Sequence, residues 1–175
     1  MSTAKWNEVI NQYIYDKNST IQFELSRKYP HFLLPYNKLC SPEGCHTKNL
    51  SGELVLSLDN VAEKEIPRNI PKTMDFLHGV RFRTSNENNS KKFKIILSEC
   101  RFRYKNINNI EKKDLQGKID GSKTLMSSDV SNILNVFIFI FDEKLIQQAI
   151  HYLYRLNPKY TWLAVTASEY NQIFN

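Results

Sequence analysis

The chain has 175 residues, 41% of them hydrophobic and 24% charged, which is typical of one soluble globular domain. Its formal net charge of +6 favours partners that carry phosphate groups, such as nucleic acid or anionic lipid. Three cysteines without an apolar signal core argue against a secreted disulfide scaffold, and the most apolar run, Val136–Phe141, is far shorter than the about 20 residues that span a bilayer. We therefore expect an intracellular protein that meets membranes only peripherally.

The first third of the chain predicts one helix followed by extended segments. Apolar residues at helical spacing predict an amphipathic helix over Thr3–Asp16. Alternating apolar residues favour a short strand over Ile21–Leu25, and prolines keep the apolar segment His31–Tyr36 extended. Leucines on one face and polar residues on the other predict a strand over Gly52–Asp59.

The middle third predicts a short helix, a hairpin and a long connection. Pro71 suits the first turn of a helix through His78, because an N–H at that position would lack a helical partner. Val80–Thr84 and Phe93–Lys105 then predict the two strands of a hairpin. The polar, lysine-rich segment Ile107–Ser128 predicts a mobile connection.

The final third gives the clearest pattern. Asn135–Phe141 is apolar on both parities, which predicts a central strand covered on both faces. Asp142 begins a helix that ends at Asn157, which precedes a proline. Tyr160–Thr166 predicts a returning strand and Ser168–Phe174 a terminal helical turn. The whole pattern predicts an α+β fold in one domain, with a mainly antiparallel sheet packed by an N-terminal and a C-terminal helix.

One loop carries three soft metal ligands. Cys40, Cys45 and His46 lie close together, whereas His31 and His78 lie elsewhere in the chain. Structural zinc usually binds two paired ligand clusters with short spacing, and here the second pair is missing. We therefore expect free cysteines in a loop and no metal or other cofactor.

An acidic pattern offers the single enzyme candidate. Asp75 precedes Glu99-x-Arg101 on a predicted strand, with Glu111 and Asp114 further along. This resembles the PD-(D/E)xK pattern of restriction endonucleases, in which an acid is followed by acid-x-lysine on a strand. Arg101 occupies the lysine position, and a guanidinium stays charged, so it cannot act as a base, although it can contact a phosphate. The alternative is a strand-face carboxylate paired with a neighbouring cation.

Basic residues gather around the predicted hairpin and the connection that follows it. Arg101, Arg103 and Lys105 share one parity of the second strand. The candidates for binding phosphates of RNA or lipid are Arg81, Arg83, Lys91, Lys92, Lys94, Arg101, Arg103, Lys105, Lys112 and Lys113. Lys118 and Lys123 extend this set into the connection. The alternative is a solvated edge ribbon whose charges prevent aggregation.

An aromatic arm precedes the loop of cysteines. It resembles the short tyrosine-based motifs that act in membrane sorting and virus budding. The arm contains Tyr29, Phe32, Leu33, Leu34 and Tyr36. The alternative is apolar packing of an extended arm against its own domain.

The order of predicted elements resembles that of rhabdovirus matrix proteins, especially the short ones of plant-infecting members. The likeness rests on Leu50–Leu58, Thr73–His78, Phe93–Leu97, Asn135–Glu143 and the strand Trp162–Val165. The sequence departs from the animal-virus members because it has no Pro-Pro-x-Tyr budding motif and no long lysine-rich N-terminal tail.

The resemblance implies a non-enzymatic structural protein of the virion and host cytoplasm. Such a protein associates with itself, condenses the viral ribonucleoprotein through its RNA and lies beneath an anionic membrane. In that family an N-terminal segment of one subunit packs on the next, so the resemblance implies that the candidates for self-association are Tyr29, Phe32, Leu33, Leu34 and Tyr36 of the aromatic arm. Two alternatives stay open, namely a metal-dependent nuclease and a basic nucleic-acid-binding adaptor subunit.

Overall fold

The computed structural model describes residues 12–40, 53–82, 93–159 and 161–174. The strands are β1 (Tyr13–Tyr15), β2 (Leu33–Pro35), β3 (Leu54–Ser57), β4 (Phe76–Phe82), β5 (Lys94–Arg101), β6 (Ile133–Phe141) and β7 (Trp162–Thr166). The α-helices are α2 (Lys17–Gln22), α3 (Glu24–Lys28), α4 (Tyr36–Cys40), α5 (Leu58–Glu65), α6 (Lys112–Leu125), α7 (Ile146–Leu156) and α8 (Ala167–Phe174). Short 3₁₀ helices are η1 (Pro30–Phe32), η3 (Ile107–Asn109) and η4 (Val130–Asn132).

The described strands form one seven-stranded sheet in the order β2-β3-β4-β5-β6-β7, with β1 pairing with the second half of β4. The pairs from β2 to β5 are antiparallel, whereas β6 lies parallel to β5 and β7 parallel to β6. Parallel neighbours need long crossover connections, which α6 and α7 supply. The sheet is therefore mixed and mostly antiparallel.

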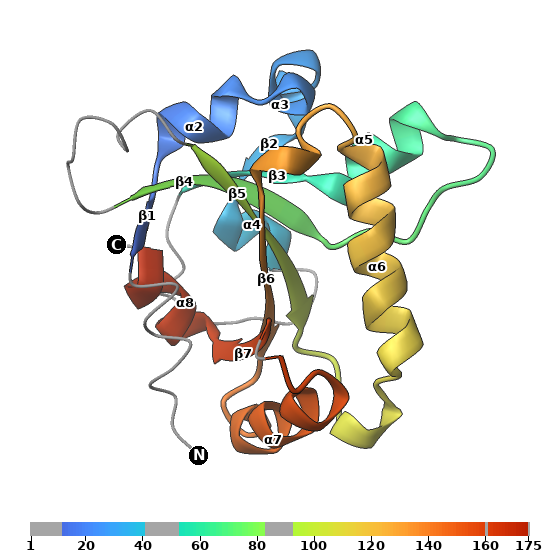
Figure 1. Ribbon diagram of the computed structural model, residues 1–175, viewed down its shortest axis with the longest axis vertical. Helices are drawn as coiled ribbons and strands as arrows, with labels where there is room; N and C mark the ends of the chain where they lie inside the picture. Colours follow the sequence, from blue (N-terminus) through green and yellow to red (C-terminus); the bar gives the residue numbers. More distant parts are fainter. Residues whose placement is uncertain (1–11, 41–52, 83–92, 160, 175) are drawn as a thin grey trace.

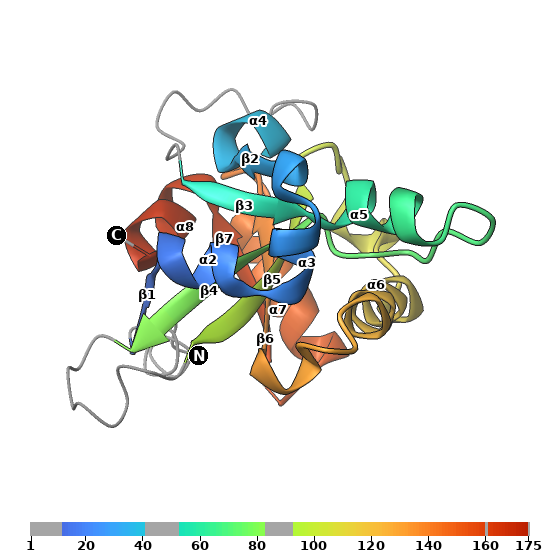
Figure 2. The ribbon, with the colours of Figure 1, turned by 90° about the horizontal axis from the view of Figure 1, so that it is seen from above.

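Helices cover both faces of the sheet, so the core has two parts. On one face, Phe137, Phe139 and Phe141 of β6 pack with buried residues of α5, α6 and α7. On the other face, Ile138 and Ile140 pack with residues of β1, α4 and α8. Figures 1 and 2 show α6 and α8 on opposite sides of the sheet. This layering follows from a central strand that is apolar on both parities.

The predicted α+β fold in a single domain is confirmed. The strand expected at Gly52–Asp59 is β3, and the central strand expected at Asn135–Phe141 is β6. The predicted hairpin is the antiparallel pair β4 and β5, whose connection lies outside the described residues. The helix after Asp142, the following strand and the terminal helix are α7, β7 and α8.

Two predictions near the start of the chain are wrong. Of the helix expected at Thr3–Asp16, residues 1–11 lie outside the described part, and Tyr13–Tyr15 is a strand. The strand expected at Ile21–Leu25 is instead the end of α2 and the start of α3. Asp16 explains the helix, because its side chain accepts hydrogen bonds from the Asn18 N–H at 3.0 Å and the Ser19 hydroxyl at 2.8 Å.

The helix expected between Pro71 and His78 is also wrong. Residues 71–75 contain no helix, and β4 begins at Phe76, which pairs with Ser98 of β5. Gly79 lies where α2 crosses β4, and a Cβ there would come within 2.6 Å of Ser19. Ladder hydrogen bonds and burial thus outweigh the local preference of Pro71 for a helical first turn.

The mobile connection expected at Ile107–Ser128 is a fourth error, because most of this segment is η3 and α6. Leu115, Ile119 and Ser122 are buried at helical spacing against the sheet. Exposed lysines and two glycines obscure this short apolar stripe in the sequence, so the helix depends on tertiary packing.

Candidate functional site

The structure brings Asp75 and Glu99 together across the β4–β5 pair. Because Phe76 pairs with Ser98 in antiparallel register, Asp75 at the start of β4 lies beside Glu99 near the end of β5. Asp75 Oδ2 accepts a hydrogen bond from the Cys100 N–H at 2.7 Å, and the Asp75 N–H donates to Glu99 Oε2 at 3.2 Å. Both carboxylates are therefore held by backbone groups, and we call them the carboxylate pair.

A cation from the helix on this face completes the site. Lys118 of α6 places Nζ 2.6 Å from Glu99 Oε1 and 3.7 Å from Asp75 Oδ1. Arg101 places Nη2 3.1 Å from Glu99 Oε1 and 3.8 Å from Asp114 Oδ2. These two acidic residues, the two cations and the Asp114 carboxylate thus form one network, which we call the charged cluster.

The sequence of α6 explains why Lys118 reaches the carboxylate pair. Leu115 and Ser122 are buried, and Lys118 lies on the same helix face, one turn from each of them. Asp114, one turn before Lys118, also faces Arg101 and forms an ion pair with Lys72 at 2.6 Å. The polar members of this stripe therefore point toward the end of β5 while its apolar members fill the core.

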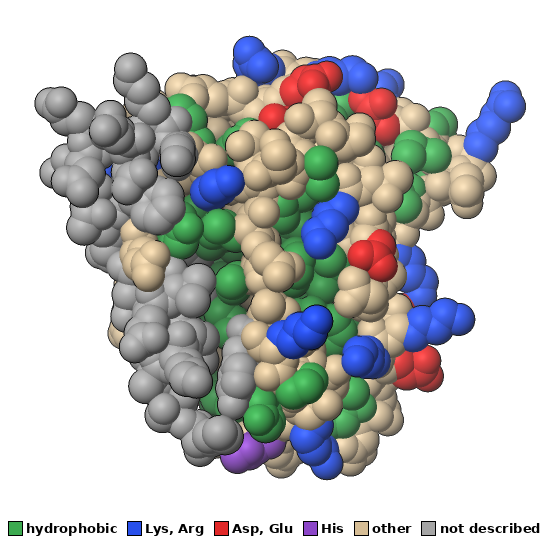
Figure 3. All heavy atoms as spheres, in the orientation of Figure 1, with side chains coloured by type: hydrophobic (Ala, Val, Ile, Leu, Met, Phe, Trp, Pro, Cys, Tyr) green, Lys and Arg blue, Asp and Glu red, His purple; other side chains and the backbone are tan. Residues whose placement is uncertain are grey.

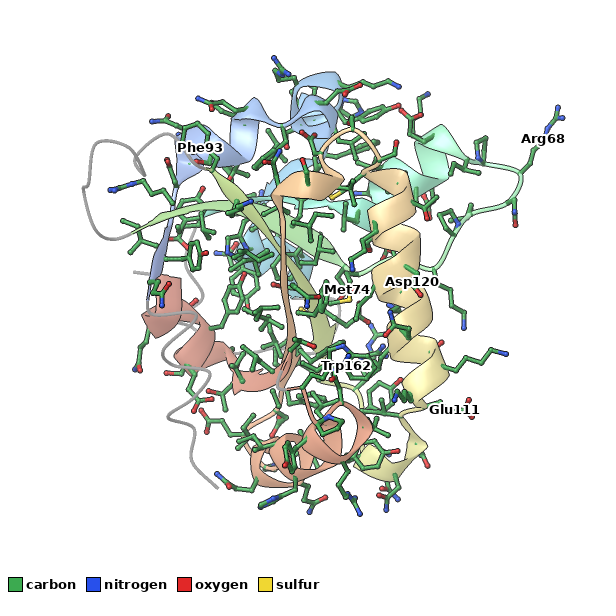
Figure 4. All side chains as sticks on the ribbon, viewed as in Figure 1. Arg68, Met74, Phe93, Glu111, Asp120 and Trp162 are labelled. Atoms are coloured by element: carbon green, nitrogen blue, oxygen red, sulfur yellow. The ribbon has the colours of Figure 1, made fainter. Side chains whose placement is uncertain are left out.

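The segment that leads into Asp75 is fastened to α6. The Met74 N–H donates to Ser122 Oγ at 2.8 Å, and Ser122 Oγ–H in turn donates to the Lys118 carbonyl at 2.8 Å. Gly121 lies against the Lys72 carbonyl so closely that a Cβ would collide with it. Figure 4 shows Met74 between the sheet and α6. These contacts fix Asp75 relative to Lys118.

Burial shapes the electrostatics of the charged cluster. Burial, together with the Asp75 charge, raises the pKa of Glu99 to about 8, although Arg101 and Lys118 act in the opposite direction. Burial alone would lower the pKa of Lys118, but the Glu99 and Asp75 charges outweigh it and the net shift is upward. Lys118 therefore stays an ammonium at neutral pH and acts as a charge, not as a base.

One further acid lies near Asp75. Asp59, in the first turn of α5, accepts a hydrogen bond from Thr73 Oγ1 at 2.6 Å. Partial burial and the nearby Asp75 charge raise the pKa of Asp59. The Glu99 side chain is only 2% exposed, whereas those of Asp75 and Lys118 are 22% and 19% exposed. A ligand would therefore reach the cluster past Asp75 and Lys118.

Asp75 and Glu99 are ligands of the kind that a magnesium-like cation takes, although Lys118 Nζ already lies beside both carboxylates. Such an ion is usually held by one or two carboxylates, with waters and substrate phosphates as its other ligands. Within the described parts of the chain, three or more His, Cys, Asp or Glu residues are nowhere grouped so as to hold a metal ion. The site could thus supply two protein ligands, Asp75 and Glu99, and would need oxygen ligands from elsewhere.

Sequence reasoning found Asp75, Glu99, Arg101 and Asp114 but missed the position of Lys118 beside the carboxylate pair. It placed Lys118 in a basic cluster on a mobile connection, because the stripe of α6 is short and interrupted. The spacing of Leu115, Ile119 and Ser122 is the sequence signal that could have identified the helix.

The basic residues predicted to bind phosphate do not form one strand face. Arg101 is 6% exposed and belongs to the charged cluster. Because β5 ends at Arg101, Arg103 and Lys105 lie on the following turn. The exposed members of the predicted set are Arg81, Arg103, Lys105, Lys112 and Lys113, and Lys94 is half-buried. The side chains of Arg83, Lys91 and Lys92 lie outside the described residues. Figure 3 shows Lys and Arg side chains spread over one face.

The aromatic arm packs on its own domain. Tyr29 is buried and donates a hydrogen bond to Glu65, and its ring stacks on Phe32 with centroids 5.6 Å apart. Leu33 and Leu34 are half-buried in β2, the edge strand that pairs with β3, and Tyr36 is 1% exposed. The structure thus supports the alternative of intramolecular packing for this segment.

His31 and His78 lie on different elements, η1 and β4. Cys45 and His46 lie outside the described residues, as does the side chain of Cys40. His31 is exposed on η1. His78 is buried, and Nδ1 lies 2.7 Å from the Tyr170 hydroxyl. These two histidines therefore belong to different environments.

Comparison with protein-family models, with curated proteins and with solved structures finds no match for this chain. Among the described helices, none combines the length and apolar character that crossing a membrane requires. The candidate function therefore depends on the geometry of the charged cluster.

Proposed function

We propose that the chain is a metal-dependent phosphodiesterase that cleaves nucleic acid. The observation that carries the proposal is the position of Lys118 Nζ, 2.6 Å from Glu99 and 3.7 Å from Asp75. The sequence pattern that resembles restriction endonucleases has Arg101 at its lysine position, and Lys118 supplies an ammonium beside the same two acids from α6. The net charge of +6 suits a polyanionic substrate.

Each residue of the charged cluster has a role in this proposal. Asp75 and Glu99 would hold the divalent cation, which when bound polarises a phosphoryl oxygen and lowers the pKa of a bound water. Lys118 would stabilise negative charge that develops on the phosphate. Arg101, fixed between Glu99 and Asp114, would orient Glu99. Positioning and charge stabilisation are the main requirements of phosphoryl transfer.

The test is incubation of the purified chain with single-stranded and duplex DNA and RNA, with Mg²⁺ or Mn²⁺ or with a chelator. Cleavage is expected only with the metal ion, and Asp75→Asn and Glu99→Gln should abolish it. Glu111→Gln is the matched control, because Glu111 is an exposed acid at the start of α6 and lies outside the charged cluster. Cleavage that persists in Glu99→Gln would contradict the proposal.

A matrix-type assembly protein is the second candidate. The observation that favours it is the set of exposed basic residues near the start of α6, which includes Arg103, Lys105, Lys112 and Lys113. Such a protein should polymerise with rising concentration and bind RNA or anionic vesicles in a salt-dependent way. Light scattering at low and high salt, with and without RNA, measures this, and a strictly monomeric chain would exclude it.

A further inference from the structure

A hollow lies between α7 and η3, outside the charged cluster. Its volume is about 450 Å³, and it is lined by Ile107, Asn108, Gln148, His151, Tyr152 and Arg155. This volume falls within the about 300–1,000 Å³ of small-molecule sites. His151 occupies an exposed position of α7.

We propose that this hollow binds an unpaired nucleotide of the nucleic acid that the chain cleaves, so that the substrate class is single-stranded. The inference depends on the proposed phosphodiesterase function for its link to cleavage. The binding surface itself is argued from the residues of the hollow.

The lining offers each kind of contact that a nucleotide needs. The Arg155 guanidinium lies over the Tyr152 ring, 5.4 Å from its centroid, and Arg155 is an exposed residue. Unpaired bases stack on aromatic rings and guanidinium planes, and arginine also binds phosphate. The side-chain amides of Asn108 and Gln148 are exposed and can pair with base edges.

The hollow is built on a fixed framework. The Tyr152 hydroxyl donates to the Ile110 carbonyl at 2.7 Å, which joins α7 to the segment between η3 and α6. Ile107 is 3% exposed and anchors η3 in the core. A preformed surface loses less conformational freedom when a ligand binds.

The hollow lies close enough to the charged cluster for one nucleic-acid strand to contact both. The chain from Arg101 to Ile107 is short, so even full extension would keep the two within roughly 20 Å. Arg103 and Lys105, both exposed, lie on the intervening turn. A base inside a duplex is stacked and paired and cannot enter the hollow. The hollow therefore favours single-stranded nucleic acid.

The test measures binding of short single-stranded oligonucleotides to the Glu99→Gln chain by fluorescence anisotropy. Adding Arg155→Ala should weaken binding roughly tenfold and lower the slope of log affinity against log salt by about one. A duplex of the same sequence should be affected less. Lys144→Ala is the control, because Lys144 is exposed in the turn before α7 and does not line the hollow. Equal effects of Arg155→Ala and Lys144→Ala would overturn the inference.

Kinetics with the otherwise native chain separate this inference from the proposed function. Arg155→Ala should raise KM while kcat stays unchanged, because the contact is the same in the ground state and the transition state. An unchanged KM in a chain that cleaves nucleic acid would refute the hollow as a substrate site and leave the phosphodiesterase intact. Oligonucleotide binding that depends on Arg155 in a chain without cleavage would support the hollow and refute the phosphodiesterase.

Discussion

Lys118 is the residue on which the charged cluster depends, because its ammonium lies beside both members of the carboxylate pair. We expect Lys118→Met to lower kcat by about 100-fold or more, in line with the loss of one preorganised electrostatic contact. Single-turnover cleavage with saturating metal ion measures this.

A matched lysine controls for the general loss of positive charge. Lys112 lies exposed at the start of the same helix, and Lys112→Met should change kcat less than twofold or so. Circular dichroism should show that both variants are folded. Equal activity of the two variants would mean that Lys118 is a structural partner of Glu99 and no more.

Tyr170 holds a buried polar group on the opposite face of the sheet. Its hydroxyl lies 2.7 Å from His78 Nδ1 and 3.4 Å from Ser98 Oγ. Tyr170→Phe leaves these polar atoms without that hydroxyl, so we expect a loss of about 1–3 kcal/mol in the free energy of unfolding. Urea denaturation measures it, and a neutral substitution would mean that water or another group replaces the hydroxyl.

Two glycines of α6 should respond oppositely to the same substitution. An added Cβ at Gly117 meets no atom within 4 Å, whereas at Gly121 it collides with the Lys72 carbonyl. Gly117→Ala should stabilise the helix by about 0.5–1 kcal/mol, because alanine loses less backbone entropy on folding. Gly121→Ala should destabilise the chain, because α6 or the segment at Lys72 must shift.

Thermal melting of the two variants measures this difference in stability, and cleavage assays test whether it also affects the charged cluster. Since Met74 binds Ser122 and Asp75 follows directly, a displaced α6 in Gly121→Ala should also impair cleavage. A stable and fully active Gly121→Ala variant would show that the packing between α6 and this segment does not position Asp75.

Two buried groups give the whole molecule a predictable dependence on pH. The pKa of Glu99 is raised from 4.5 to about 8, so between these values the folded state binds a proton that the unfolded state has lost, and stability falls as pH rises. Burial lowers the pKa of His78 from 6.5 to about 3, so between these values the unfolded state binds more protons, and stability rises with pH.

The two effects oppose each other between pH 4.5 and 6.5, and only that of Glu99 acts between 6.5 and about 8. We therefore expect the free energy of unfolding to rise below pH 4.5, to change little up to pH 6.5 and then to fall, by at most about 1.4 kcal/mol per pH unit. Urea titrations at several pH values measure the profile. Glu99→Gln should remove the fall above pH 6.5, and an unchanged fall in that variant would assign it to other groups.

The sequence by itself determined the elements whose burial pattern is local. The two apolar parities of β6, the spacing of α7 and the alternation of β3 are each complete within one short segment, so they predicted an α+β domain correctly. The sequence also indicated the acid pair, because Asp75 and Glu99 occupy the acidic positions of the PD-(D/E)xK pattern, with Arg101 at its lysine position.

Only the tertiary structure decided how those acids meet and what joins them. The register of β4 on β5 places Asp75 beside Glu99, and register depends on pairing between segments far apart in sequence. Lys118 became part of the charged cluster because packing against the sheet makes α6 a helix in a lysine-rich segment with two glycines. Sequence reasoning placed Arg101 on a basic surface, but in the structure it is buried. Tertiary packing is again the reason, since β5 is covered on both faces and its end is enclosed by α6.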